Sequence, residues 1–171
     1  MKKITQILGL GILFLFVTTL SLSAQKCKYA YNKIDPLTGE ETKGTTFRPI
    51  YYCQMSFNKI GETYYVEMAI GYQGNIRDII QKGDPVIFKL SNGEIVTITS
   101  QDEYIPMAYA STAAITTRYK AQYDIDSTIL QKIAANPPIF FRMNIGSKVE
   151  QKEISAKDGK KISEAARCIL Q

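Results

Sequence analysis

Hydrophobic and polar residues alternate along two neighbouring segments, which is the pattern of half-buried β-strands. The segments are Ile50–Asn58 and Thr63–Tyr72, and the glycine-containing stretch Lys59–Glu62 separates them. Two alternating segments joined by a short turn predict an antiparallel hairpin. The side chains expected to face the core are Tyr51, Cys53, Met55 and Phe57 in the first segment and Tyr64, Val66, Met68 and Ile70 in the second.

A second hairpin is predicted where Ser91-Asn92-Gly93 separates Val86–Leu90 from Glu94–Ser100. Asn-Gly between segments rich in β-branched residues is the strongest short-range hairpin signal, because both residues tolerate a positive φ.

Three further strands are expected, at Lys26–Ile34, Ile115–Ile125 and Ile139–Ile145, the last of them near the middle of the sheet at Phe140 and Phe141. Proline and glycine predict turns at 35–39 and 82–85, because proline fixes φ and glycine tolerates a positive one. We expect a loop over 40–46 and a connection over 101–106, while 75–81 fits either a helical turn or an edge strand.

Two helices are predicted near the end of the chain. The first covers Thr128–Ala135, with Asp126 or Ser127 as its N-cap and Asn136-Pro137-Pro138 as its stop, because proline has no backbone donor. The second lies near 159–170, with Asp158 as a reasonable N-cap and an apolar stripe of Ile162, Ala165, Ala166 and Ile169. The expected fold class is therefore α+β, with six or seven mostly antiparallel strands in a single domain spanning 25–171.

The first 24 residues have the composition of a secretory signal peptide. Lys2 and Lys3 precede the uncharged apolar run Ile7–Val17, and small residues lead to Ala24. Cleavage before Gln25 would remove this leader and leave no membrane span, because the run is shorter than the 20 or so residues that a spanning helix needs. A retained anchor is the alternative. We expect an exported protein, either periplasmic or at the cell surface.

The composition excludes several kinds of chemistry. Lys2 and Lys3 belong to the leader, so 19 basic and 16 acidic residues give the remainder a net charge of +3, and this mild excess is not clustered as nucleic-acid binding requires. The chain has no histidine, the commonest general base and zinc ligand, and no tryptophan. We expect no cofactor and no metal. The chain has eleven tyrosines, whose amphipathic side chains suit strands and binding interfaces.

Three cysteines follow the leader, and one disulfide is expected in an exported protein. We favour Cys27 with Cys168, because the ends of a domain often lie close together. The alternative is that all three cysteines are reduced and buried, and pack as small apolar residues.

Candidate sites are few, and each has a structural alternative. Tyr52 and Tyr65 are predicted on faces opposite the core, where they could contact a glycan or protein partner or merely pair across strands. Asp124 and Asp126 could act as a carboxylate pair, although a helix cap with a solvated neighbour is the simpler interpretation. The other candidates considered, each with a structural explanation favoured, are Asp35 with Glu40 and Glu41 as an acidic patch, Asp102 with Glu103 as an acidic pair, Cys53 as a nucleophile, and Lys148, Lys152, Lys157, Lys160 and Lys161 as a basic tail.

The chain resembles small uncharacterised exported proteins of Bacteroidetes-type bacteria. The resemblance lies in Ser-Ala-Gln at the end of the leader, the segment CKYAYNKIDPLTGEE, the KGDP and SNGE turns around a strand, and a strand leading into a capped helix. Asp35, Thr38 and Gly39 match the turn after the first strand of those proteins. The resemblance implies a β-rich periplasmic or surface domain and transfers no activity.

The functional hypothesis from sequence is a non-catalytic binding or interaction module of the cell envelope, with a protein or glycan partner. A carboxylate-based hydrolase acting on glycan or peptidoglycan is the first alternative, and a structural or assembly subunit is the second. The oligomeric state does not follow from the sequence.

Overall fold

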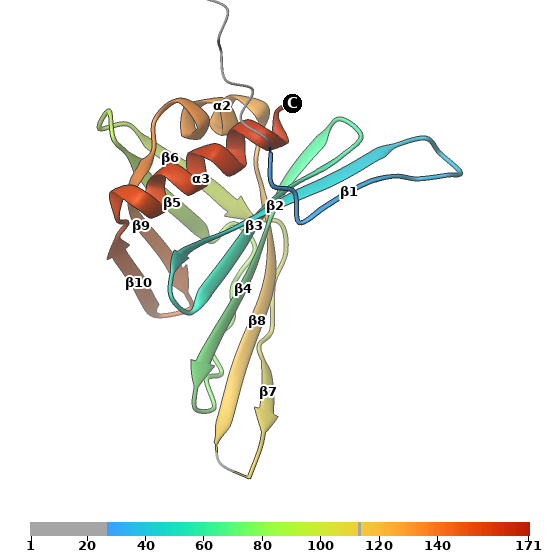
Figure 1. Ribbon diagram of the computed structural model, residues 1–171. Coiled ribbons are helices and arrows are strands. Elements are labelled where there is room, and N and C mark those ends of the chain that lie inside the picture. The colour runs from blue at the N-terminus through green and yellow to red at the C-terminus, as the bar shows by residue number, and fades with distance from the viewer. Residues whose placement is uncertain (1–26, 113) are drawn as a thin grey trace, which may run out of the picture.

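A computed structural model describes residues 27–112 and 114–171 of the chain, so the predicted leader lies outside the described residues. It contains one large antiparallel sheet and two helices (Figure 1). The strands are β1 (Tyr31–Ile34), β2 (Glu41–Ile50), β3 (Cys53–Ile60), β4 (Thr63–Gln73), β5 (Pro85–Leu90), β6 (Ile95–Ser100), β7 (Met107–Ala110), β8 (Ile115–Asp124), β9 (Pro138–Ile145) and β10 (Lys148–Glu153). The helices are α2 (Ser127–Ala135) and α3 (Ala156–Ile169).

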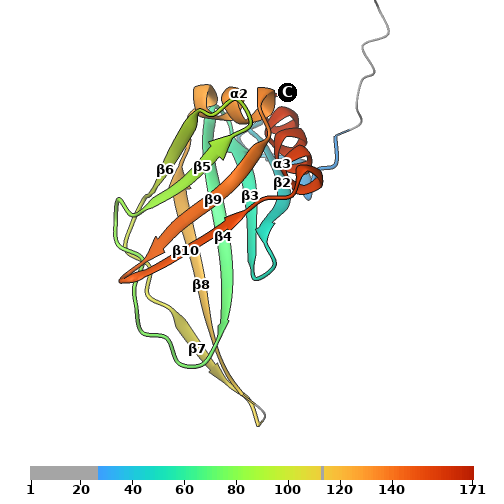
Figure 2. The same cartoon turned by 90° about the vertical axis from the view of Figure 1, so that its left-hand side faces the viewer.

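The sheet runs in the order β1-β2-β3-β4-β8-β6-β5-β9-β10, and β7 pairs with β8 beside this path. It bends where β8 meets β6, because only two residue pairs, Thr99 with Asp124 and Ser100 with Tyr123, join these strands. The bend divides the sheet into two limbs, β1–β4 with β7 and β8, and β6-β5-β9-β10. Helix α3 contacts β2 and β3 on one limb and β9 on the other, so it fills the space between them (Figures 1 and 2).

The core lies between the limbs, on the face of the sheet that α3 covers. Alternate residues of each strand point inward, as the period of two requires. Phe57, Phe88, Tyr119 and Phe141 are among the largest fully buried side chains. The opposite face of the second limb is open to solvent, and Figure 2 turns this face of β6, β5, β9 and β10 toward the reader.

The antiparallel α+β class is confirmed, but the sheet has ten strands where six or seven were predicted. The predicted loop over 40–46 is wrong, because β2 spans Glu41–Ile50. Its polar residues find partners inside the fold: Lys43, only 2% exposed, pairs with Glu41 at 3.0 Å, and Thr45 donates to the Ala165 carbonyl of α3. The strands β7 and β10 were also missed, because both are sheet edges without inward alternation.

The first predicted hairpin forms, with shifted boundaries. Cys53, Met55 and Phe57 are fully buried as expected, but Tyr51 is 89% exposed because it lies in a two-residue turn between β2 and β3. The Asn-Gly hairpin is confirmed as β5–β6, and Gly93 takes the positive φ of 88° that the turn requires. The segment 75–81 is neither helix nor strand, apart from a single bridge between Ile80 and Tyr104.

Three further expectations differ in detail. Strand β1 is shorter than predicted. Strand β9 pairs with β5 and with the edge strand β10, so it lies near the border of the sheet and not at its middle. The N-cap of α3 is Ser155 and not Asp158: the Ser155 hydroxyl accepts from the Asp158 backbone N–H and donates to the Asp158 carboxylate at 2.7 Å. The prediction that Asp126 caps α2 is confirmed.

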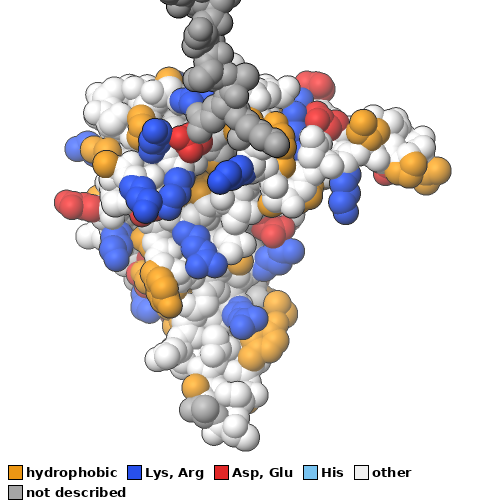
Figure 3. All heavy atoms as spheres, in the orientation of Figure 1, with side chains coloured by type: hydrophobic (Ala, Val, Ile, Leu, Met, Phe, Trp, Pro, Cys, Tyr) orange, Lys and Arg blue, Asp and Glu red, His pale blue; other side chains and the backbone are white. Residues whose placement is uncertain are grey.

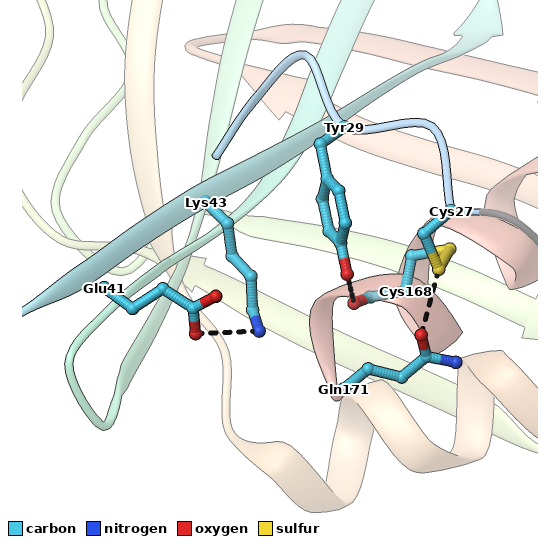
Figure 4. Close-up of polar contacts among 6 residues, drawn as sticks. All are labelled: Cys27, Tyr29, Glu41, Lys43, Cys168 and Gln171. Atoms are coloured by element: carbon cyan, nitrogen blue, oxygen red, sulfur yellow. Dashed lines mark hydrogen bonds and ion pairs between the residues drawn. A yellow bond between two sulfur atoms is a disulfide. The ribbon is translucent and has the colours of Figure 1, made fainter. Parts of the chain in front are cut away.

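The disulfide between Cys27 and Cys168 is present and joins the start of the described chain to α3 (Figure 4). The Tyr29 hydroxyl donates to the Cys168 carbonyl at 2.9 Å, and the Gln171 side-chain amide lies 3.2 Å from the Cys27 sulfur. The disulfide sulfur carries no proton, so this last contact is a packing contact. The bridge and the Tyr29 hydrogen bond together hold the N-terminal segment against the end of α3.

Candidate functional site

A groove of about 590 Å³ opens where the two limbs of the sheet join. We call it the junction groove and define it by Glu62, Thr97, Thr99, Asp124, Asp126 and Ser127. It exists because β8 leaves the sheet after Asp124 to enter α2, so the threonines on the outward face of β6 have no neighbouring strand to cover them. The β3–β4 turn supplies Glu62 at the other wall.

Three carboxylates line the junction groove, and none of them forms an ion pair within the described residues. Asp126 uses one oxygen to accept from the Ile129 backbone N–H at 2.7 Å, which caps α2. Asp124 uses one oxygen to accept from the Gln101 side-chain amide at 2.9 Å. Each carboxylate therefore keeps an oxygen that can accept a hydrogen bond from a ligand.

The rest of the junction groove has hydroxyl and apolar character. Thr97, Thr99 and Ser127 carry hydroxyl groups that can both donate and accept. Tyr64 and Ile129 also line it, and the Lys59 ammonium lies 5.6 Å from the centre of the Tyr64 ring. Among residues 27–112 and 114–171, no lysine or arginine belongs to the lining. This set of groups favours a ligand with amino or hydroxyl groups over an anion.

The sequence pointed to part of this site. The pair Asp124 and Asp126 was a candidate, and both residues do line one groove. Glu62, Thr97, Thr99 and Ser127 were missed, because nothing in a single sequence places the β3–β4 turn beside β6. The alternation of Glu94–Ser100, which puts Thr97 and Thr99 on one face, was the available signal.

The two candidate tyrosines lie apart, so they do not form one platform. Tyr65 points away from the core and lies directly across from Asp124 in the β4–β8 register, at the border of the junction groove. Tyr52 lies in the β2–β3 turn on the inner side, where its ring packs against Tyr72 with centroids 5.5 Å apart. Its hydroxyl donates to Glu150 of β10 at 2.5 Å.

Tyr52 belongs to an inner tyrosine cluster, which we define as Tyr52, Tyr72, Tyr119, Lys148 and Glu150. The Lys148 ammonium lies 4.6 Å from the Tyr72 ring centre, and the Tyr119 ring meets Tyr72 edge-on. Burial, and then the Glu150 carboxylate, raise the pKa of Tyr52 and of Tyr72 well above the ordinary value for tyrosine. The Tyr72 hydroxyl is buried without a partner at hydrogen-bond distance among the described residues. This cluster joins the two limbs of the sheet.

The remaining candidates have structural explanations. Cys53 is fully buried, and burial raises the pKa of its thiol, which opposes a nucleophilic role. Asp35 accepts from the backbone N–H groups of Leu37 and Thr38, which lower the pKa of its carboxyl and fix the turn. Asp102 and Glu103 are exposed on a connection. The described residues contain no group of three histidine, cysteine or acidic side chains placed to hold a metal ion.

A second groove, of about 470 Å³, lies beside the disulfide and is lined by Lys28, Lys161 and Glu164 among others. Its charges are mixed, and Lys161 is already paired with Asp158 at 2.8 Å. The face that carries α3 shows the same mixture, with lysine and arginine side chains among fewer acidic ones (Figure 3). The basic tail is thus a mixed-charge surface, and the junction groove is the stronger candidate site.

Comparison with protein-family models, curated proteins and solved structures gives no significant match to this chain. Among the described helices, neither has the length and apolar character needed to cross a bilayer.

Proposed function

We propose that this protein is an exported, non-catalytic binding module of the bacterial cell envelope and that its ligand lies in the junction groove. The observation that supports the proposal is a groove of about 590 Å³ whose unpaired carboxylates and hydroxyls face solvent. Such groups bind amines and sugar hydroxyls by hydrogen bonds, and the unpaired carboxylates add attraction for a cation.

Export is part of this proposal. It draws support from the leader-like residues 1–24 and from a Cys27–Cys168 disulfide, since such bridges persist in oxidising compartments. The described chain is also compatible with a domain that works outside the cytoplasm, because its only other cysteine is buried in the core.

The test uses the protein produced with its own leader and two probes of defined chemistry, trilysine amide and chitotriose. Isothermal titration calorimetry measures the affinity of each probe. We expect saturable binding of at least one. Replacing the exposed carboxylates in Glu62→Gln/Asp124→Asn should weaken it about tenfold, because each exposed charge contributes up to about 1 kcal/mol. Asp102→Asn is the matched control and should bind like the unsubstituted protein.

A carboxylate-based hydrolase remains the second candidate, because three carboxylates share the junction groove. Incubation of the same probes followed by mass spectrometry separates the two functions. Recovery of intact probe supports the binding module. If the protein releases shorter fragments and Asp124→Asn abolishes this release, the hydrolase is the correct function and the binding module is not. If neither probe binds, or if the groove variant and the control bind equally well, the junction groove is not the binding site.

A further inference from the structure

A second depression lies beside the junction groove, on the outward face of β5, β6 and β9. Thr97 of β6, which lines the groove, lies directly across from Ile87 of β5, and Ile87 lies across from Arg142 of β9. These three side chains point outward in a single row, away from the core. Neither of the described helices crosses this face (Figure 2). A ligand that leaves the groove toward β9 therefore meets a continuous surface.

This second depression, which we call the outer hollow, has a volume of about 190 Å³ and is defined by Ile87, Lys89, Ile95, Phe140 and Arg142. Ile95 is 64% exposed, and Ile87 and Phe140 are half-buried, so an apolar floor faces solvent. Lys89 lies between Ile95 and Phe140 in the strand register, and Arg142 lies across from Ile87. Neither is in an ion pair within the described part of the chain, and Arg142 donates only to the Gln151 side chain, at 2.9 Å.

The junction groove and the outer hollow therefore differ in charge, although Glu153 of the edge strand β10 lies across from Phe140. Glu62, Asp124 and Asp126 carry unpaired negative charge at the junction groove, and Lys89 and Arg142 carry unpaired positive charge at the outer hollow. Along the row Thr97–Ile87–Arg142, the groove, an apolar side chain and an uncovered cation follow one another. This arrangement is complementary to a ligand that has a cation, an apolar group and an anion in that order.

The separation of the two ends matches an extended polypeptide. From β8, which carries Asp124, to β9, which carries Arg142, there are three strand spacings, or about 14 Å. An extended chain advances about 13 Å over four residues, and its alternate side chains point to the same side. A basic, an apolar and an acidic side chain at every second position would reach the groove, the floor and the two cations.

We infer that the open face binds an extended polypeptide segment of the form basic–x–apolar–x–acidic. The segment crosses the strands, with its basic side chain in the junction groove and its acidic side chain between Lys89 and Arg142. The inference rests on the proposed function, because it names the partner class of the same groove. A glycan would not use the outer hollow in this way, since it offers neither an aliphatic side chain for the floor nor, when neutral, an anion for the cations.

The experiment measures fluorescence anisotropy of the labelled peptide Ser-Lys-Ser-Leu-Ser-Glu-Ser, acetylated and amidated at its ends, with the protein produced with its own leader. We expect saturable binding that weakens at 0.5 M NaCl, because exposed charges are screened there. Asp124→Asn and Arg142→Gln should each weaken binding two- to fivefold. Ile95→Ser should also weaken it, while peptides with leucine replaced by serine or lysine replaced by glutamate should bind less well.

Lys152→Gln is the matched control, because Lys152 is exposed on the neighbouring strand β10 and lies across from the inward-facing Phe141. It should bind like the unsubstituted protein. Circular dichroism of each variant establishes that it is folded. Binding that responds to Asp124→Asn but not to Arg142→Gln or Ile95→Ser would overturn the polypeptide inference and leave the junction groove in place. If the peptide does not bind at all, the polypeptide inference fails. If trilysine amide and chitotriose do not bind either, the proposed function fails as well.

Discussion

The disulfide offers the clearest quantitative prediction about stability. Cys27 and Cys168 are separated by 141 residues, so their bridge closes almost the whole described chain into one loop. In the chain-entropy account a loop of this length restricts the unfolded state by about 5 kcal/mol. Two hydrogen bonds of the N-terminal segment do not depend on the bridge. The Tyr29 hydroxyl donates to the Cys168 carbonyl, and the Ala30 backbone N–H donates to the Gly44 carbonyl at 2.7 Å.

We therefore expect Cys27→Ser/Cys168→Ser to lower the free energy of unfolding by about 3–5 kcal/mol and the melting temperature by about 10–15 °C. Urea denaturation followed by circular dichroism measures the first, and a thermal scan measures the second. The fold itself should persist, because a domain of this size does not depend on a bridge for its core.

Cys53→Ala is the control, because Cys53 is buried and outside the bridge. That variant should retain the sensitivity to dithiothreitol that the double variant loses. If the double variant unfolds at the same urea concentration as the unsubstituted protein, or if dithiothreitol has no effect on the latter, the reasoning from loop closure is refuted.

Three further outcomes are expected. Asp126→Ala should cost about 1 kcal/mol in urea denaturation, because the Ile129 backbone N–H loses its acceptor, whereas Asp126→Asn should cost much less; equal costs would contradict the capping role. Gly159→Ala should lower the melting temperature, because a Cβ at this position would lie 2.4 Å from the Pro138 carbonyl oxygen. This clash should outweigh the helix propensity of alanine, which exceeds that of glycine by about 1 kcal/mol. A higher melting temperature would contradict the close packing of α3 on β9. Stability should also fall above pH 10. Burial raises the pKa of Tyr52, Tyr72 and Tyr123 in the folded state above the value of about 10 that tyrosine has in the unfolded chain. The protonated hydroxyls therefore contribute their full stability below about pH 10, and this contribution is lost as the pH rises toward the folded-state pKa. Absorbance at 295 nm and circular dichroism should change together, and tyrosines that all ionise near pH 10 in a folded protein would contradict this.

Local signals in the sequence predicted the local structure well. The β5–β6 hairpin follows from Asn92-Gly93, and the start of α2 follows from Asp126, because each depends on the conformation of a few adjacent residues. The Cys27–Cys168 pairing was predicted from a general rule alone, namely that the two ends of a domain often lie close together. Strand β2 was missed because its buried Thr45 has a partner far away in the sequence: Thr45 bonds to Ala165, 120 residues away.

The candidate site was less accessible to prediction for the same reason. Asp124 and Asp126 are two positions apart in the sequence, so the sequence alone indicates them as a pair. Their neighbours Thr97 and Glu62 come from other elements, which only the bend between β8 and β6 brings near. The separation of Tyr52 from Tyr65 depends on the two-residue turn after Ile50, which shifts Tyr52 out of the strand that the alternation predicted.

If the junction groove and the outer hollow form the binding face of this protein, a bound peptide must change the environment of both. Backbone-amide NMR during titration with the lysine–leucine–glutamate peptide measures this. We expect shifts concentrated in Glu62, Thr97, Thr99, Asp124 and Arg142, with the inner tyrosine cluster unchanged. Shifts concentrated at Tyr52 and Glu150 instead, or beside the disulfide at Lys161, would contradict it.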